Sequence, residues 1–182
     1  MMHDDAYTYV SVDLLPQLSL GREDIAAIAQ FKMAAWPYDL ASQIDWLKKK
    51  TEPDDRHVVA RSGRIIVGYL RITARRMAGI SSPRVVGIST VLTLPDARLR
   101  GIGRTIMDAA RKEIEADKDD VVGMLCCADD RRGFYEKCGW QNIDISVVRA
   151  DAPAKNFFSD RNVMVFGESE LPAIVLLHGS TF

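Results

Sequence analysis

Several features are scarce in this 182-residue sequence, and each scarcity excludes a class of protein. The three cysteines (Cys126, Cys127 and Cys138) match no zinc-ligand spacing, and no histidine lies near them in the sequence. The apolar run AIVLL (Ala173 to Leu177) is far too short to cross a bilayer. The opening MMHDDAYTYV lacks the apolar core of a signal peptide. We therefore predict a cytoplasmic protein with reduced thiols, no bound metal and no membrane segment.

Neither sign of charge dominates. The sequence has 24 Lys and Arg against 25 Asp and Glu, a formal net charge of −1. The composition is that of an ordinary globular protein, with 47% hydrophobic and 27% charged residues. Without a global basic field we expect no nucleic-acid partner, and any anion site must be local. The length fits a single domain spanning residues 1–182.

Hydrophobic periodicity predicts a mixed α/β fold. The last part of the chain offers strands in ISVVRA, NVMVF and AIVLL. The other expected elements, in chain order, are a strand at Ala6–Val12, helices at Gly21–Trp36 and Leu40–Lys50, a hairpin turning at Ser62–Gly63, a strand at Arg84–Leu94, a helix from Ile102, a strand at Val121–Cys127 and a short helix stopped by Gly139. Along the helix from Ile102 we expect one continuous apolar face, made by Ile102, Ile106, Ala109, Ala110 and Ile114.

The stretch PDARLRGIGRTIM (Pro95 to Met107) has the composition of an anion-binding loop. Two glycines and three arginines follow a strand and precede a helix, so backbone N–H groups and guanidinium groups are available together. Ile106 stands where a dinucleotide-binding fingerprint needs its third glycine. No Gly-Lys-Ser/Thr follows, which excludes a P-loop. The pattern suits a diphosphate.

Two motifs resemble those of the GNAT-type N-acetyltransferase superfamily. Val91 to Arg104 resembles its acetyl-CoA-binding motif, with Arg98, Gly101 and Gly103 at the core positions. Phe134 to Trp140 resembles its aromatic-Tyr-x-x-x-Gly-aromatic segment. The resemblance implies a central, mostly antiparallel twisted sheet that is flanked by helices and splays near the glycine loop. It also implies a cofactor-binding core over about 60–145, acceptor-side helices over about 21–50 and C-terminal strands over about 143–178.

By this resemblance the cofactor is acetyl-CoA. Backbone groups of Val91, Leu92 and Thr93 would pair with the pantetheine arm. Ala128 stands where many members carry an asparagine, so one expected cofactor contact is missing. The residues expected around the diphosphate are Arg98, Leu99, Arg100, Gly101, Ile102, Gly103 and Arg104.

The resemblance makes Tyr135 the acid that protonates the departing sulfur, since a phenol stays protonated at neutral pH. The base is not assigned, because Thr90 stands where an acid is expected on the cofactor strand. Asp39, Asp45 and Asp160 are more typical of solvated or capping acids, and His57 and His178 of structural histidines. Candidates for contact with the acceptor are Asp39, Trp36 and Thr90.

The implied function is transfer of an acetyl group to a primary amine of a small molecule, by direct attack in a ternary complex. One alternative is an aminoglycoside N-acetyltransferase, because residues 125–140 are similar to those of the 2'-N-acetyltransferases. Another is a non-catalytic CoA-binding regulatory domain. The sequence leaves open a longer acyl donor, and a monomer or a homodimer.

Overall fold

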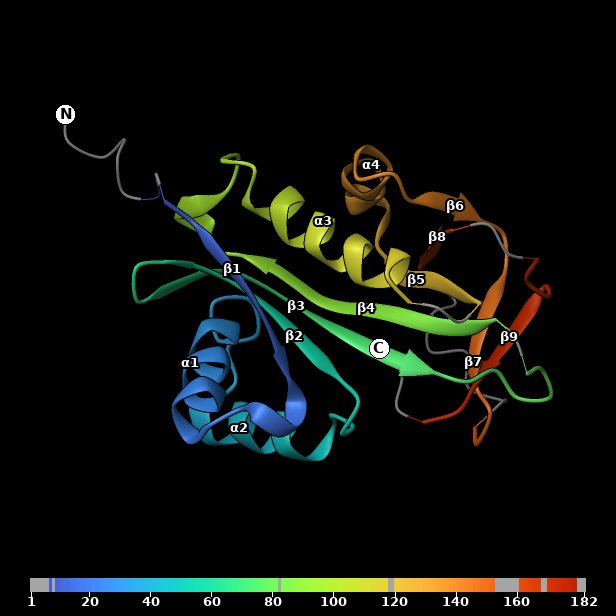
Figure 1. The fold of residues 1–182 in the computed structure, drawn as a ribbon, viewed down its shortest axis with the longest axis horizontal. Coiled ribbons are helices and arrows are strands. Elements are labelled where there is room, and N and C mark those ends of the chain that lie inside the picture. The colour runs from blue at the N-terminus through green and yellow to red at the C-terminus, as the bar shows by residue number, and fades with distance from the viewer. Residues whose placement is uncertain are drawn as a thin grey trace. The chain divides into compact units, whose positions relative to one another are not determined.

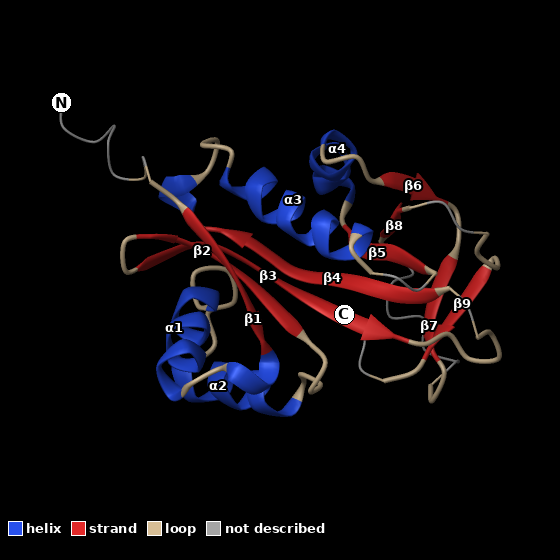
Figure 2. Cartoon of the chain, viewed as in Figure 1, coloured by secondary structure: helices blue, strands red, loops and turns tan. Residues whose placement is uncertain are grey.

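The computed structural model describes residues 7, 9–81, 83–117, 120–152, 161–167 and 170–179. Figures 1 and 2 show a mixed α/β fold with helices beside a sheet. Within the described residues there are four α-helices, and the main sheet is mostly antiparallel, which confirms the predicted fold class. The strand order in the main sheet is β1-β2-β3-β4-β5-β8-β6, and β7 and β9 form a second, two-stranded sheet. The chain forms two compact units, residues 1–72 with 90–109 and residues 73–89 with 110–182.

The helices and strands have these bounds: β1 Ser11–Pro16, α1 Arg22–Lys32, α2 Leu40–Lys49, β2 Arg56–Ser62, β3 Ile65–Arg75, β4 Arg84–Thr93, α3 Ile102–Glu115, β5 Val121–Cys127, α4 Asp129–Lys137, β6 Gln141–Ile143, β7 Ser146–Arg149, β8 Asn162–Phe166 and β9 Ile174–Leu177. Two short 3-10 helices occupy Gln17–Ser19 and Pro95–Ala97.

In the first unit, β1, β2 and β3 form an antiparallel meander. The β2–β3 hairpin turns at Gly63, whose φ of 59° suits glycine. Residues of α1 and α2, such as Ile28 and Leu47, form a core with Val59 and Tyr69 of the strands. Because side chains alternate along a strand, Gly68 faces the other side, where it meets Ile102 and Ile106 of α3. The sheet of this unit therefore carries α1 and α2 on one face and the start of α3 on the other (Figure 1).

In the second unit, β4 pairs in parallel with β5 from Arg84 to Gly87, and the pairing ends there although both strands continue. β8 pairs antiparallel with β5 and with β6. β7 and β9 pair in parallel. One buried cluster of this unit lacks aromatic residues, and it consists of Met77, Val85, Val122, Met124, Val147, Val163, Val165, Val175 and Leu177.

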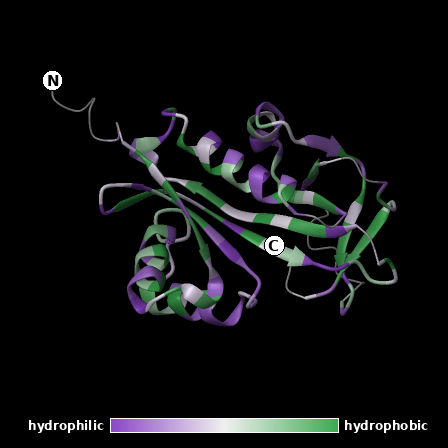
Figure 3. Cartoon of the chain, viewed as in Figure 1, coloured by the Kyte–Doolittle hydropathy of each residue, from purple (hydrophilic) through white to green (hydrophobic). Residues whose placement is uncertain are grey.

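Most predicted elements are present, and two of them differ from the predicted bounds by more than one residue. The first strand runs over Ser11–Pro16 rather than Ala6–Val12, because its register with β2 starts at Ser11 opposite Arg61. Pro16 is tolerated because β1 is an edge strand. The first helix ends at Lys32 rather than Trp36, which precedes a proline that disfavours helical backbone. The prediction for α3 holds, with Ala109 half-buried and the other four positions buried. Figure 3 shows hydrophobic and hydrophilic residues alternating along this helix.

Candidate functional site

The loop before α3 is shaped by two residues with positive φ. Leu99 has φ 62° and Gly101 has φ 80°. Glycine reaches this region without strain, whereas leucine does so at a cost. The Leu99 side chain is fully exposed, so packing does not explain its conformation. The loop is therefore bent at two points within three residues, immediately before the helix.

The N-terminus of α3 is open toward this loop. The first hydrogen bond of the helix runs from the Thr105 N–H to the Gly101 carbonyl, at 3.0 Å. The N–H groups of the turn before Thr105, which include those of Ile102, Gly103 and Arg104, therefore have no partner inside the helix. These groups and the helix dipole together favour an anion.

The strand and the sheet hold this helix end in place. Leu94 N–H donates to the Val67 carbonyl at 2.9 Å, which ties the end of β4 to β3. A methyl group added to Gly68 would lie 2.8 Å from Ile102 Cγ2, so the first turn of α3 lies directly on the β3 backbone. A bulkier residue at position 68 would displace it.

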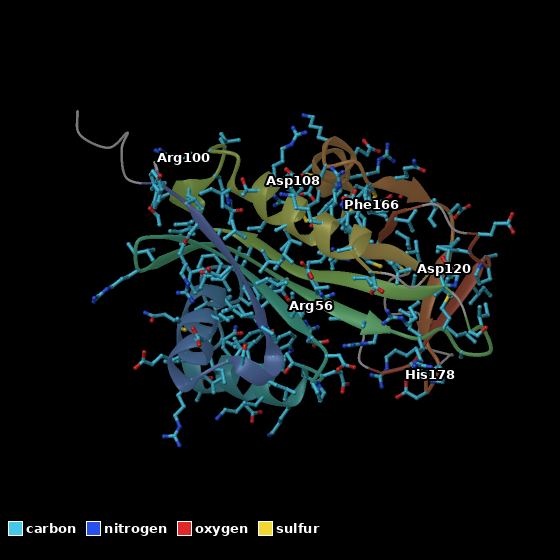
Figure 4. All side chains as sticks on the ribbon, in the orientation of Figure 1. Arg56, Arg100, Asp108, Asp120, Phe166 and His178 are labelled. Atoms are coloured by element: carbon cyan, nitrogen blue, oxygen red, sulfur yellow. The ribbon has the colours of Figure 1, made fainter. Side chains whose placement is uncertain are left out.

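Three arginines of the loop, Arg98, Arg100 and Arg104, are exposed. Figure 4 shows Arg100 at the loop, and its guanidinium carbon lies 5.4 Å from the ring centroid of Tyr7. Exposed guanidinium groups around an open helix N-terminus are the donor set that a diphosphate needs. The residues present therefore fit the diphosphate of a CoA thioester.

Thr90 begins the last part of β4, and its φ is 54°. For a β-branched residue this is a genuine outlier. The burial pattern changes at the same place: Val85 to Ile88 are buried, whereas Ser89 to Val91 are half-buried. The backbone of β4 is therefore irregular at Thr90, in the strand where the pantetheine contacts are expected. Sequence reasoning missed this feature, which no local pattern signals.

Tyr135 lies on α4 and is 9% exposed. Burial raises the pKa of its phenol, so the group stays protonated at neutral pH. Within the described ranges no hydrogen bond is found for its hydroxyl. Gly139, with φ 85°, ends the helix as the sequence predicts, and the Trp140 N–H donates to the Tyr135 carbonyl at 3.1 Å.

Ala128, the residue that replaces the expected asparagine, caps α4 without a side-chain hydrogen bond. An amide is nevertheless present beside it. Asn162 of β8 pairs with Cys127, and its side chain donates to Asp129 at 2.6 Å. The sequence does not reveal this amide, because 34 positions separate it from Ala128.

Of the acids considered in the sequence, the structure describes Asp39 and Asp45, and each has a local partner. Asp39 caps α2 by accepting from the Ser42 N–H at 2.9 Å, and these hydrogen bonds lower its pKa. Asp45 pairs with Lys49 on the surface. Trp36 is 39% exposed. Asp160 lies outside the described residues.

His57 is buried and hydrogen-bonded at both ring nitrogens. Nδ1 lies 2.7 Å from the Tyr69 hydroxyl and Nε2 lies 2.7 Å from Gln17 Oε1. Burial and the nearby Arg71 and Lys32 lower its pKa to about 4. A neutral imidazole that is hydrogen-bonded at both nitrogens and has this pKa is a structural group and a poor base.

The cysteines, the possible metal ligands and the possible membrane spans are considered last. Cys126, Cys127 and Cys138 are free thiols, and burial raises the pKa of Cys126 to about 12. In the part of the chain that the structure describes, no group of His, Cys, Asp and Glu side chains is placed to hold a metal. No helix there is long and apolar enough to span a bilayer.

The sequence and the fold agree on a family. A family model described as "Acetyltransferase (GNAT) domain" matches residues 18–154, which is more than half of the chain. The chain belongs to the GNAT acetyltransferase family. It is thus an acyltransferase by family. No curated protein matches the sequence at a significant level.

Solved structures show the same fold at low identity. An acyl-CoA N-acyltransferase from Pseudomonas aeruginosa has a TM-score of 0.63 and 16% identity, and the match covers 87% of this chain and 100% of that one. Escherichia coli ElaA has a TM-score of 0.63 and 16% identity, covering 86% and 99%. An aminoglycoside N-acetyltransferase in complex with CoA has a TM-score of 0.59 and 12% identity, covering 73% and 88%. These likenesses support the GNAT fold and leave the acceptor open.

Proposed function

We propose that this GNAT domain transfers an acetyl group from acetyl-CoA to a primary amine of a small molecule. The observation that carries the proposal is the open first turn of α3, reached through the positive-φ residues Leu99 and Gly101 and surrounded by three arginines. GNAT enzymes use CoA thioesters, and one structural neighbour holds CoA.

Binding begins with the diphosphate in this proposal. The N–H groups of Ile102, Gly103 and Arg104 donate to its oxygens, while Arg98, Arg100 and Arg104 neutralise its charge. Backbone groups of Val91, Leu92 and Thr93 orient the pantetheine arm. The positive φ of Thr90 departs from regular strand backbone, and in this proposal a peptide N–H beside it donates to the thioester carbonyl and polarises it.

Transfer proceeds by direct attack. The neutral amine nitrogen forms a bond to the acetyl carbon, the carbon–sulfur bond breaks, and the thiolate takes the proton of the Tyr135 hydroxyl. Burial keeps that phenol protonated until the sulfur departs. The nitrogen loses its extra proton to water. Since a free alkylamine has a pKa of about 10.4 in the lysine reference case, only a small fraction is reactive at neutral pH. Activity is therefore expected to rise with pH.

Calorimetric titration with acetyl-CoA tests the binding part. We expect micromolar affinity that is weakened at least tenfold, about 1.4 kcal/mol, when Arg98, Arg100 and Arg104 are changed to alanine. Arg64→Ala is the matched control, because Arg64 is also exposed but lies at the β2–β3 turn. Absence of binding to acetyl-CoA and CoA by the unchanged protein would remove the basis of the proposal.

Tyr135→Phe tests the catalytic part. The variant keeps the ring and its packing and loses only the hydroxyl. We expect turnover to fall by about 10²–10⁴, the range of general acid catalysis, with acetyl-CoA affinity within twofold of the unchanged protein. Unchanged turnover would refute the acid role. If the protein binds acetyl-CoA but acetylates no amine, that result favours the alternative of a CoA-binding regulatory domain.

A further inference from the structure

Charged side chains are buried together in the first unit, between α1, α2 and the sheet. Lys32 is the last residue of α1 and is 4% exposed. Its Nζ lies 3.4 Å from the ring centroid of Trp46, a residue of α2. The guanidinium carbon of Arg71, a residue of β3 that is 1% exposed, lies 5.0 Å from the same ring. Two cations therefore converge on one indole.

The carboxylate that the structure describes in this cluster, Asp55, forms an ion pair with Arg71. The guanidinium donates to Asp55 at 3.2 Å and to the Lys50 carbonyl at 2.8 Å. Asp55 is completely buried. Among the residues that the structure describes, no carboxylate pairs with Lys32. The interaction that the structure describes for its ammonium group is the cation–π contact with the ring of Trp46.

The other polar side chains that the structure describes around Lys32 are neutral. His57 lies directly opposite Arg71 in the β2–β3 register. It is neutral, with its nitrogens bonded to Tyr69 and Gln17. Burial raises the pKa of Tyr69, so the phenol is neutral as well. Lys32 and Arg71 are thus the described basic side chains of the cluster that can carry positive charge, and Asp55 is its described carboxylate.

A buried cation without a counterion is costly, and proteins compensate by neutralising it. Here the pKa of Lys32 is lowered to about 7 by burial and by Arg71. An anion placed against Lys32 would restore its charge and complete the balance. The cluster is therefore matched to a ligand that carries negative charge and accepts hydrogen bonds.

This cluster is separate from the diphosphate loop. Arg71 and Tyr69 lie on the same face of β3, two residues apart, and Tyr69 packs with α1 and α2. Gly68 meets α3 on the opposite face. An anion at Lys32 thus lies on the side of the sheet that carries α1 and α2.

We propose that Lys32, with Arg71 and Trp46, forms a binding site for an oxyanion, the carboxylate or phosphate of a small molecule. Resting on the proposed function, we assign this oxyanion to the amine acceptor. The acceptor would then be an acidic amine rather than a polycation such as an aminoglycoside.

Calorimetric titration with sodium sulfate and, separately, with sodium acetate tests the site without acetyl-CoA. Both anions are fully ionised at pH 8, and sodium chloride at matched ionic strength controls for screening. We expect saturable binding of at least one of them. We also expect uptake of about nine-tenths of a proton per bound ion, measured in buffers of different ionisation enthalpy, because a group with pKa about 7 is mostly neutral at pH 8.

Three variants make the test specific. Lys32→Met should weaken binding at least tenfold. Lys32→Arg should retain binding within about threefold but abolish proton uptake, since arginine does not titrate in this range. Lys48→Met removes an exposed lysine of α2 and should change nothing. Circular dichroism confirms that each variant is folded.

Absence of saturable binding by the unchanged protein, binding that survives Lys32→Met, or binding without proton uptake would overturn the proposal. These outcomes are independent of acetyl-CoA binding, so failure of this site and failure of the proposed acetyl transfer are distinguishable. The acceptor assignment has its own measurement: an ω-amino acid should be acetylated at least tenfold better than its neutral amide. Equal rates would overturn that assignment.

Discussion

Replacing Gly68 by alanine tests how closely the first turn of α3 packs against the sheet. The added Cβ would lie 2.8 Å from Ile102 Cγ2, 3.3 Å from Ala60 Cβ and 3.5 Å from Ile106 Cγ2. Favourable carbon contacts begin at about 3.5 Å, so α3 and β3 must separate by roughly half an ångström or more. Both atoms nearest to the new methyl group belong to short side chains held in a close-packed layer.

The expected cost follows from overpacking. Extra methyl groups in a packed core destabilise by about 1–3 kcal/mol, and the gain from removing a glycine offsets about 0.4–1 kcal/mol of this. A net loss of about 1–2 kcal/mol lowers the Tm of a chain of this size by roughly 2–8 °C. The same displacement moves the N–H groups of the first turn of α3, so acetyl-CoA affinity is expected to fall several-fold.

The assay is thermal unfolding followed by circular dichroism, together with calorimetric titration of acetyl-CoA. Gly133→Ala is the matched control, because a Cβ at this α4 position meets nothing within 4 Å. Helix propensity makes that change stabilising by about 1 kcal/mol. If Gly68→Ala kept the Tm and the acetyl-CoA affinity of the unchanged protein, the first turn of α3 would not pack as closely on β3 as inferred here.

Three further predictions concern strain, packing and pH. Leu99→Gly relieves a positive φ without losing packing, so we expect about 0.5–1 kcal/mol of stabilisation, whereas Leu99→Ala, the control, should lie within about 0.5 kcal/mol of the unchanged protein in urea unfolding. Gly123→Ala places a methyl group 2.8 Å from Ile114 Cδ1 and 3.0 Å from Trp140 Cη2, and we expect a loss of about 1–3 kcal/mol in the same assay; a change below 0.5 kcal/mol would contradict the packing. The pKa of His57 is about 4 in the folded protein and about 6.5 in the unfolded chain, so its contribution to stability is present above pH 6.5 and is lost as the pH falls toward 4. Urea unfolding across that range should show a loss of roughly 3 kcal/mol that is absent from His57→Gln.

Local patterns determine much of this fold, which explains what the sequence could predict. The helix α2 starts at the predicted residue and ends one residue before the predicted end. Asp39 caps its start, and the apolar spacing marks its buried face. The strand Val121–Cys127 and the stop at Gly139 are found as predicted. In each case the signal lies within a few residues of the feature that it specifies.

Features that depend on distant residues could not be predicted. Lys32, Trp46, Asp55 and Arg71 come from four separate segments, and only the packing of α1 and α2 on the sheet brings them together. The short strand β6 was missed, because it consists of QNI and exists through its pairing with β8. The conformation of Thr90 is imposed by its surroundings against its own preference.

The position of β8 between β5 and β6 has a consequence for synthesis of the protein on the ribosome. β5 ends at Cys127 and β6 ends at Ile143, yet the strand that joins them begins at Asn162. At about 5–20 residues per second, translation needs on the order of seconds to supply it. During that interval the apolar edge of β5 has no partner, and an unpaired edge of this kind recruits other chains. A nascent chain stalled before Asn162 would therefore be the form most in need of a chaperone, and truncation there is expected to yield aggregates rather than a smaller folded domain.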